Sequence, residues 1–167
     1  THKGATIFGT KVPDPERSGV VEFDPTTNEV ISLEEKPEKP KSDYAITGMY
    51  IFDSTVSDRA KKLKPSKRGD LEIIDLQRSY LEEGKLNFVK LPEGSKWFDT
   101  GTPASLLEAS QYIKELQENS NTLIGCLEVS SFKSYNISLV RLRELAKKMP
   151  ISVYKHYVDK YIERWIR

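Results

Sequence analysis

The stretch YAITGMYIF, residues 44–52, decides the fold class of this chain. It is an almost unbroken run of residues that favour strands, bounded by polar residues on both sides. Strands of half-exposed sheets alternate apolar and polar residues, whereas strands covered on both faces read as continuous apolar runs. We therefore expect residues 44–52 to form a strand that is buried on both faces.

The residues before this stretch also read as strands. Residues 5–12 are rich in β-formers and end at Pro13-Asp14-Pro15, which is typical of a turn. Residues 19–24 and 29–35 are two short strand candidates around the turn-forming run 25–28, so a hairpin is expected. The polar run 34–43, with its two prolines, predicts a surface loop.

The residues after this stretch alternate between helix and strand. A first helix is expected over about 56–63, and a second one carries an apolar face that stops at Gly84 (Leu71, Ile74, Leu76, Tyr80 and Leu81). Residues 86–91 read as a strand. Thr102-Pro103 is a helix start, and the apolar stripe that follows predicts a helix to about Glu118. Alternating strands and helices predict an α/β fold with a mixed sheet.

The last third of the chain has a different, helical character. Residues 137–149 and 152–166 each carry apolar residues at spacings of three and four, and Pro150 separates them. The expected organisation is therefore an α/β part over residues 1–119 and a helical appendage over residues 120–167.

Composition excludes several classes of protein. The chain has 167 residues, and 26 basic against 25 acidic side chains give a net charge of +1, which argues against a nucleic-acid binder. No apolar run approaches the roughly 18–20 residues of a membrane span, and no signal peptide is visible. The single cysteine, Cys126, fits a reducing compartment, so a cytoplasmic location is expected. The start at Thr1 rather than Met favours a fragment of a longer protein.

Common catalytic motifs are also missing. The two histidines lie near opposite ends of the sequence, and no His or Cys cluster has metal-ligand spacing. A lone cysteine such as Cys126 is more often a small core residue than a nucleophile. The nine glycines are scattered and form neither a GxGxxG nor a Walker loop.

Three polar stretches are harder to explain by packing alone. In Glu34-Glu35-Lys36-Pro37, Glu35 could bind a sugar hydroxyl and Lys36 a phosphate; the alternative is a charged strand edge that blocks pairing. In the loop 67–70, Arg68 could approach an anion, although this signal alone is weak. In WFDTGTP, residues 97–103, Asp99 should be paired, capping or metal-bound, and the alternative is a plain turn residue.

Taken in order, these stretches resemble a known family. GVVEFD at 19–24, EEKP at 34–37, AITGMYIFD at 45–53, RGDLEI at 68–73 and WFDTGTPASLLEAS at 97–110 are similar to the sugar-1-phosphate nucleotidyltransferases, above all to their thymidylyltransferase branch. GATIFG at 4–9 and IGCLEVSSF at 124–132 extend the likeness over residues 4 to about 132. The tail after Ser134 is similar to the family only in its helical character.

The resemblance implies a fold and a reaction. The fold would be the C-terminal part of a Rossmann-like nucleotidyltransferase core with a mixed sheet, followed by a helical tail. The reaction would join dTTP and glucose 1-phosphate to give dTDP-glucose and pyrophosphate with Mg²⁺, within dTDP-rhamnose biosynthesis. The partners would be these substrates, a second copy in a homo-oligomer and the family's N-terminal half, with no nucleic acid and no membrane.

The resemblance also assigns roles to individual residues. Glu35 would bind glucose hydroxyls, and Lys36 and Arg68 would contact the phosphate as the catalytic pair. Gly19, Ile46 and Gly48 would line the sugar pocket. Asp99 would be one of two carboxylates that hold Mg²⁺.

Two departures from the family leave alternatives open. Ser18 stands where the family usually has an aromatic residue, and the triphosphate loop and base-reading residues have no counterpart here. The chain alone is therefore expected to be inactive. The alternatives are a relative that transfers another nucleotide, a non-catalytic sugar-phosphate-binding or regulatory module, and a dimerisation fragment.

Overall fold

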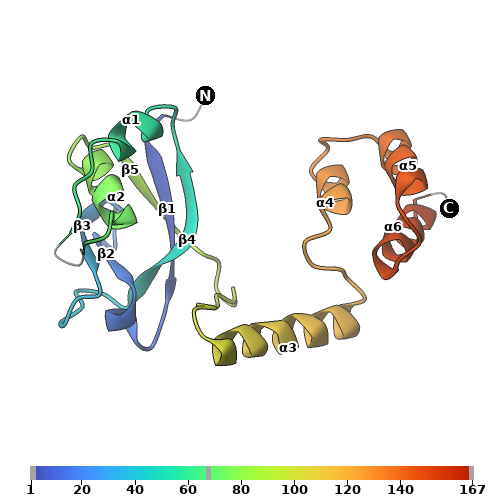
Figure 1. Ribbon diagram of the computed structural model, residues 1–167, viewed down its shortest axis with the longest axis horizontal. Helices are drawn as coiled ribbons and strands as arrows, with labels where there is room; N and C mark the ends of the chain where they lie inside the picture. Colours follow the sequence, from blue (N-terminus) through green and yellow to red (C-terminus); the bar gives the residue numbers. More distant parts are fainter. Residues whose placement is uncertain (1–2, 67–68, 166–167) are drawn as a thin grey trace. The chain divides into compact units, whose positions relative to one another are not determined.

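The computed structural model describes residues 3–66 and 69–165 (Figure 1). The chain forms two compact units, Thr1–Trp97 and Phe98–Arg167, and each is described by itself. The boundary expected from the sequence lies after the helix that begins at Pro103, whereas this division lies before it. The functional assignment of residues 1–119 and 120–167 stays a prediction.

The first unit is built on a five-stranded mixed sheet. Its strands are β1 (Ala5–Lys11), β2 (Gly19–Phe23), β3 (Val30–Glu35), β4 (Tyr44–Phe52) and β5 (Leu86–Lys90), in the order β3-β2-β4-β1-β5. β1 and β5 run parallel, and the other pairs are antiparallel. A short 3-10 helix, Pro15–Arg17, precedes β2. The expected hairpin of β2 and β3 and the mixed α/β sheet are confirmed.

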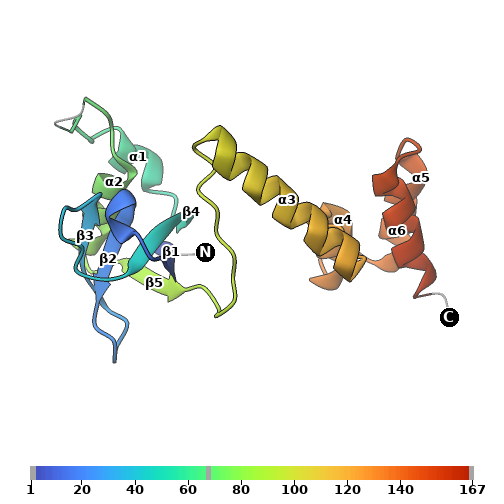
Figure 2. The same cartoon turned by 90° about the horizontal axis from the view of Figure 1, so that it is seen from below.

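Two helices, α1 (Val56–Ala60) and α2 (Ile73–Leu81), cover one face of this sheet (Figures 1 and 2). The apolar side chains buried on this face form the core of the unit: Ile7, Val21, Leu33, Ile46, Ile74 and Phe88, with Ala5, Leu76 and Tyr80 beside them. Leu71 was expected on the helical face, but α2 begins after it and its side chain is 60% exposed. That expectation is wrong because Leu71 lies in the loop before the helix.

Burial of β4 differs between its two halves. Ala45, Ile46 and Thr47 are buried, but Met49 is 48% and Ile51 47% exposed. The expectation of burial on both faces is therefore wrong for the second half. The helices of this unit cover one face only, and the apolar residues of the other face are partly open to solvent among the described residues.

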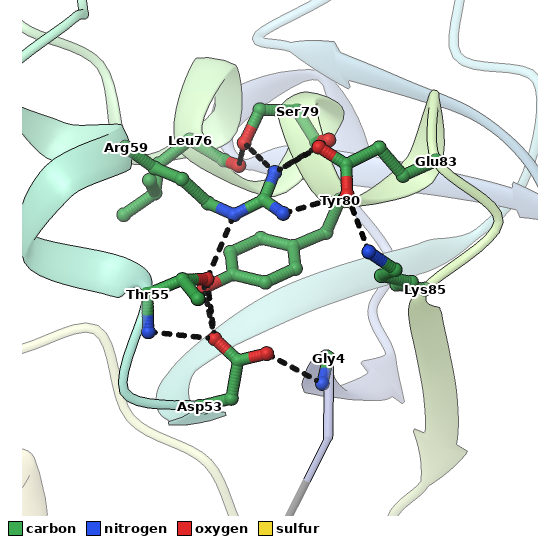
Figure 3. Close-up of polar contacts among 9 residues, drawn as sticks. All are labelled: Gly4, Asp53, Thr55, Arg59, Leu76, Ser79, Tyr80, Glu83 and Lys85. Carbon is green, nitrogen blue, oxygen red and sulfur yellow. Dashed lines mark hydrogen bonds and ion pairs between the residues drawn. The ribbon is translucent and has the colours of Figure 1, made fainter.

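A polar network joins the start of β1, the end of β4 and both helices (Figure 3). The Asp53 carboxylate accepts hydrogen bonds from the Gly4 amide at 2.9 Å and from the Tyr80 hydroxyl at 3.0 Å. The Arg59 guanidinium lies over the Tyr80 ring, 4.0 Å from its centroid, and makes two hydrogen bonds to Glu83, at 2.8 and 2.7 Å. These contacts fix α1 and α2 to one end of the sheet.

The second unit is helical: α3 (Pro103–Ser120), α4 (Leu127–Lys133), α5 (Leu139–Lys148) and α6 (Val153–Glu163). Thr102 caps α3 through a capping box with Ser105, as the Thr102-Pro103 start predicts. The helices α4, α5 and α6 enclose a core that includes Leu142 and Val158, which confirms the helical tail. Within the described ranges, no helix has the length and apolar character that crossing a bilayer requires.

Candidate functional site

The end of the β2–β3 hairpin brings three of the predicted residues together. Glu35 is the last residue of β3 and pairs with Gly19 of β2. A Cβ atom built on Gly19 would lie 3.3 Å from Glu35 Oε2, 3.5 Å from Ile74 Cδ1 and 3.7 Å from Ile46 Cδ1. Gly19 therefore lies beside the Glu35 carboxylate and two isoleucines, and any larger residue at position 19 would press against that carboxylate.

Lys36 has an unusual backbone conformation. Its φ is +45°, in the left-handed region that non-glycine residues rarely adopt. The Lys36 amide donates to the Ser18 carbonyl at 3.0 Å, which holds this conformation at the end of the hairpin. Left-handed backbone costs an L-residue roughly 1–2 kcal/mol, and such strained residues concentrate at functional sites.

Glu35 and Lys36 line a cavity of about 480 Å³. Its other walls come from α2 and the segment before it: Ser66, Glu72, Ile74, Asp75 and Arg78. The volume falls within the range of about 300–1,000 Å³ that is common for small-molecule sites. Glu35, Glu72 and Asp75 can accept hydrogen bonds from hydroxyls, and Lys36 and Arg78 carry positive charge, so the lining suits a polar ligand with several hydroxyl groups.

Arg78 connects the α2 wall of the cavity to β3. Its Nε and Nη2 atoms donate to the Leu33 carbonyl at 3.1 and 2.8 Å, and its Nη1 atom donates to Asp75 Oδ1 at 2.6 Å. Leu33 is two residues before Glu35, so this contact sets the distance between the helix and the strand end. The sequence reasoning missed Arg78. Its only local signal was the i,i+3 pair with Asp75, which many surface helices carry.

Tyr50 of β4 lies in the electrostatic field of this site. Burial raises the pKa of the Tyr50 hydroxyl, and the negative charge of Glu35 raises it further. Tyr50 shares the helix-covered face of β4 with Ile46, since Tyr50 packs against the core cluster that contains Ile46 and Ile74. The hydroxyl therefore stays protonated, and Tyr50 is not among the residues that line the cavity.

Gly48 lies on β4 between Ile46 and Tyr50 and is exposed. No heavy atom lies within 4 Å of a Cβ built on it, so the space beside it is open. Gly48 does not line the cavity of Glu35 and Lys36. Its place in a sugar pocket stays a prediction.

Asp99 lies in the second unit and is exposed. Its Oδ1 atom accepts a hydrogen bond from the Gly101 amide at 3.2 Å, directly before the cap of α3. This contact is the turn role that was the alternative to metal binding. Among residues 3–66 and 69–165, no group of three His, Cys, Asp or Glu side chains could hold a metal ion. Metal binding by Asp99 stays a prediction.

Arg68 lies outside the described residues, as does Lys67. The expected approach of Arg68 to Lys36 therefore stays a prediction. The neighbouring Gly69 is described, with a φ of +88°.

The comparisons with known proteins identify the family. A family model described as nucleotidyl transferase matches residues 1–116. Glucose-1-phosphate thymidylyltransferases are similar over nearly the whole chain: that of Neisseria meningitidis is 45% identical over 98% of this chain and 56% of its own length, and that of Xanthomonas campestris 44% over 97% and 55%. The chain thus spans about half the length of the curated relatives it matches.

Solved structures agree with this fold. A structure described as a glucose-1-phosphate thymidylyltransferase of Bacillus anthracis in complex with a sucrose matches with a TM-score of 0.58 and 43% identity, over 66% of this chain and 43% of that chain. A UDP-glucose pyrophosphorylase matches with a TM-score of 0.61 at 21% identity, which supports the fold alone. The family's substrates are a sugar 1-phosphate and a nucleoside triphosphate, and its members generally use a divalent metal. From its sequence and its fold, this chain belongs to the nucleotidyl transferase family.

Proposed function

We propose that this chain forms the sugar-phosphate side of a glucose-1-phosphate thymidylyltransferase, which makes dTDP-glucose and pyrophosphate from dTTP and glucose 1-phosphate. The observation that carries the proposal is the cavity at the end of β3 that Glu35 and Lys36 line, with Gly19 beside the Glu35 carboxylate and Ile46 beside Gly19. These are four of the residues to which the sequence resemblance assigns sugar-phosphate binding. The identity to thymidylyltransferases over nearly the whole chain supports the same substrate.

In this proposal each residue binds one part of the sugar phosphate. Glu35 accepts hydrogen bonds from glucose hydroxyls, and Gly19, Ile46 and Gly48 line the sugar. Lys36 and Arg68 neutralise the phosphate. An oxygen of that phosphate attacks the α-phosphorus of dTTP in line, and pyrophosphate leaves with the bonding electrons. Catalysis of this kind rests on positioning and charge neutralisation rather than on proton transfer.

Mg²⁺ is the proposed metal, and Asp99 the proposed ligand from this chain. One exposed carboxylate does not by itself make a site for a cation that prefers six oxygen ligands. The described residues therefore do not fit Mg²⁺ on their own, and a second carboxylate would have to come from elsewhere. When bound, the cation would neutralise charge on the phosphates. We further propose a cytoplasmic homo-oligomer.

Direct titration of the chain with glucose 1-phosphate tests the proposal. We expect binding that weakens about tenfold or more in Lys36→Ala, since a charge-assisted contact to phosphate contributes about 1.5–3 kcal/mol. Lys39→Ala is the matched control, because Lys39 is an exposed lysine of the same loop that does not line the cavity. Equal loss in both variants, or no binding at all, would contradict the proposal.

A further inference from the structure

One polar side chain in the core of the first unit has no partner. Gln77 of α2 is 1% exposed, and both Nε2 and Oε1 of its amide lack a hydrogen bond. Within residues 3–66 and 69–165, no other buried side chain has an atom in this state. Thr47, for comparison, is 3% exposed and donates to the Phe8 carbonyl at 3.0 Å. Because a buried amide without a partner lowers stability, packing alone does not account for a glutamine at position 77.

Gln77 lies behind one wall of the cavity that Glu35 and Lys36 line. It follows Ile74 by about one helical turn on the buried face of α2, and Ile74 is part of the cavity lining. Ile74 belongs to the core cluster that also contains Ile46, and Tyr50 packs against this cluster. Gln77 itself is not among the lining residues. Its amide can therefore act on a ligand of the cavity only through a neighbouring side chain.

Tyr50 is the polar neighbour of Gln77. Burial and then the negative charge of Glu35 raise the pKa of the Tyr50 hydroxyl, whereas the Gln77 side chain lowers it. A hydrogen-bond donor lowers the pKa of a phenol because it stabilises the phenolate, so the amide nitrogen faces the Tyr50 oxygen. The amide nitrogen has no hydrogen-bond partner, however. The two groups are therefore neighbours whose hydrogen bond is not formed in this structure.

We propose that Gln77 is a positioning residue of the sugar-phosphate site. When a sugar phosphate occupies the cavity, the Gln77 amide donates to the Tyr50 oxygen, and the Tyr50 O–H is then directed at the Glu35 carboxylate. A phenolic oxygen accepts while its O–H donates, and a carboxylate has about four acceptor positions, so Glu35 keeps room for sugar hydroxyls. A hydrogen bond that forms only in the bound state adds to the affinity. The proposal rests on the proposed sugar-phosphate role of Glu35.

The variant Gln77→Met tests the proposal. Methionine has a similar length and no group that needs a partner, so the urea unfolding midpoint should stay the same or rise. Calorimetric titration should show that glucose 1-phosphate binds about fivefold more weakly, which corresponds to the loss of one neutral hydrogen bond. A glutamine with a purely structural role predicts the reverse, lower stability with unchanged affinity. Unchanged affinity would overturn the proposal whatever the stability does.

The variant Leu76→Met is the matched control. Leu76 is the adjacent residue of α2 and is 5% exposed, but it belongs to a different core cluster, with Ala5 and Tyr80. The same replacement there should leave the affinity for glucose 1-phosphate unchanged. An equal loss of affinity in Leu76→Met would show that any change in the core of α2 disturbs the cavity, and the proposal would be wrong.

The variant Tyr50→Phe shows whether Gln77 acts through Tyr50. It removes the hydroxyl and keeps the ring, so it also serves if Gln77→Met does not fold. We expect Tyr50→Phe to bind glucose 1-phosphate about fivefold more weakly, and the double variant to bind no more weakly than either single variant. Losses that multiply, to about 25-fold in the double variant, would show that the two residues act independently and would overturn the proposal.

Nuclear magnetic resonance detects the proposed hydrogen bond directly. The Gln77 side-chain amide signals of the ¹⁵N-labelled chain are assigned by their absence from Gln77→Met. Saturation with glucose 1-phosphate should move one of the two amide protons downfield in the wild type and neither in Tyr50→Phe. A shift that persists in Tyr50→Phe would assign the bond to another partner, such as a buried water, and no shift in the wild type would exclude the bond. Either result would overturn the proposal.

Failure of this proposal can be distinguished from failure of the sugar-phosphate function. If Lys36→Ala loses affinity for glucose 1-phosphate while Gln77→Met binds like the wild type, the sugar-phosphate function stands and the positioning role of Gln77 is wrong. If the wild-type chain does not bind glucose 1-phosphate, both proposals are wrong.

Discussion

At the scale of single residues, Lys36 combines a strained backbone with a charged side chain at the cavity. Two substitutions separate these properties. Lys36→Ala and Lys36→Gly both remove the ammonium group, but only glycine adopts a φ of +45° without strain. We expect the glycine variant to be more stable than the alanine variant by about 1 kcal/mol, and both to lose affinity for glucose 1-phosphate equally. Urea unfolding and calorimetric titration measure the two effects, and lower stability of the glycine variant would contradict this account.

Gly19 provides a second prediction at this scale. The Cβ of Gly19→Ala would lie 3.3 Å from Glu35 Oε2, so the carboxylate must shift by a few tenths of an ångström. We expect glucose 1-phosphate to bind several-fold more weakly to Gly19→Ala, and more weakly still to Gly19→Val, with folding retained. If the effect acts through the carboxylate, it should disappear in a Glu35→Ala background, as a double-mutant cycle would measure. An undiminished effect in that background would exclude Glu35 as the cause.

Local sequence signals singled out Glu35 and Lys36, which the structure places at one cavity, but they indicated only part of the surroundings of these residues. Glu35 and Lys36 stand out because charged residues and a proline follow an apolar strand directly. Arg78 gave no comparable signal, because its partner is the backbone carbonyl of Leu33, 45 residues away. Every residue carries a backbone carbonyl, so the sequence does not show which one Arg78 contacts. The contact can be recognised only in the folded unit, where α2 packs on β3.

At the scale of elements, Arg78 couples α2 to β3. We expect Arg78→Gln to weaken glucose 1-phosphate binding severalfold although Lys36 and Glu35 remain, because the wall opposite them loses its anchor to Leu33. Arg141→Gln is the matched control, since Arg141 makes a similar i,i+3 ion pair with Glu144 on α5. Titration calorimetry measures both. A loss of the same size in the control would show that the coupling is not specific.

The network of Figure 3 predicts how stability depends on pH. Hydrogen bonds from Arg59 and Lys85 lower the pKa of Glu83 to about 2, and contacts from Thr55 and Gly4 also lower the pKa of Asp53. Both groups have higher pKa values, near 4, in the unfolded chain. The stability they contribute is therefore present above about pH 4 and is lost as the pH falls toward 2.

Urea unfolding between pH 7 and pH 2 checks this prediction. We expect Glu83→Gln to lower the unfolding midpoint at pH 7 and to flatten its decline in acid. Glu82→Gln, a change at the adjacent exposed carboxylate, is the control. If the unfolding midpoints of the wild type and of Glu83→Gln depend on pH in the same way, Glu83 does not contribute to the stability of the folded chain.

Elements were predictable where their signals were local. The hairpin of β2 and β3 follows from its turn residues, and the start of α3 follows from Thr102-Pro103. Exposure along β4 was not predictable, because the same apolar run fits a strand covered on one face or on two. The difference depends on what packs against Met49 and Ile51, and the sequence of the strand itself does not specify what covers that face.

At the scale of the whole molecule, the chain is expected to bind a sugar phosphate without transferring a nucleotide. In-line attack requires donor and acceptor to be positioned together, and the glycine-rich phosphate motifs of nucleotide sites have no match here. We expect no pyrophosphate release when the purified chain is incubated with dTTP, glucose 1-phosphate and Mg²⁺. A coupled pyrophosphate assay measures it, and turnover above the buffer background would contradict this expectation.

The parallel pairing of β1 with β5 affects how the first unit is synthesised. β1 ends at Lys11 and its parallel partner β5 begins at Leu86, so β1 cannot complete this pairing until β5 has been synthesised. Such long-range pairing is slow because the intervening loop must close first. During translation, the hairpin of β2 and β3 can form early, while β1 remains unsatisfied along one side. Until residue 90 is made, the edge of β1 that faces β5 stays unpaired, and an unpaired strand edge in an incomplete chain favours aggregation.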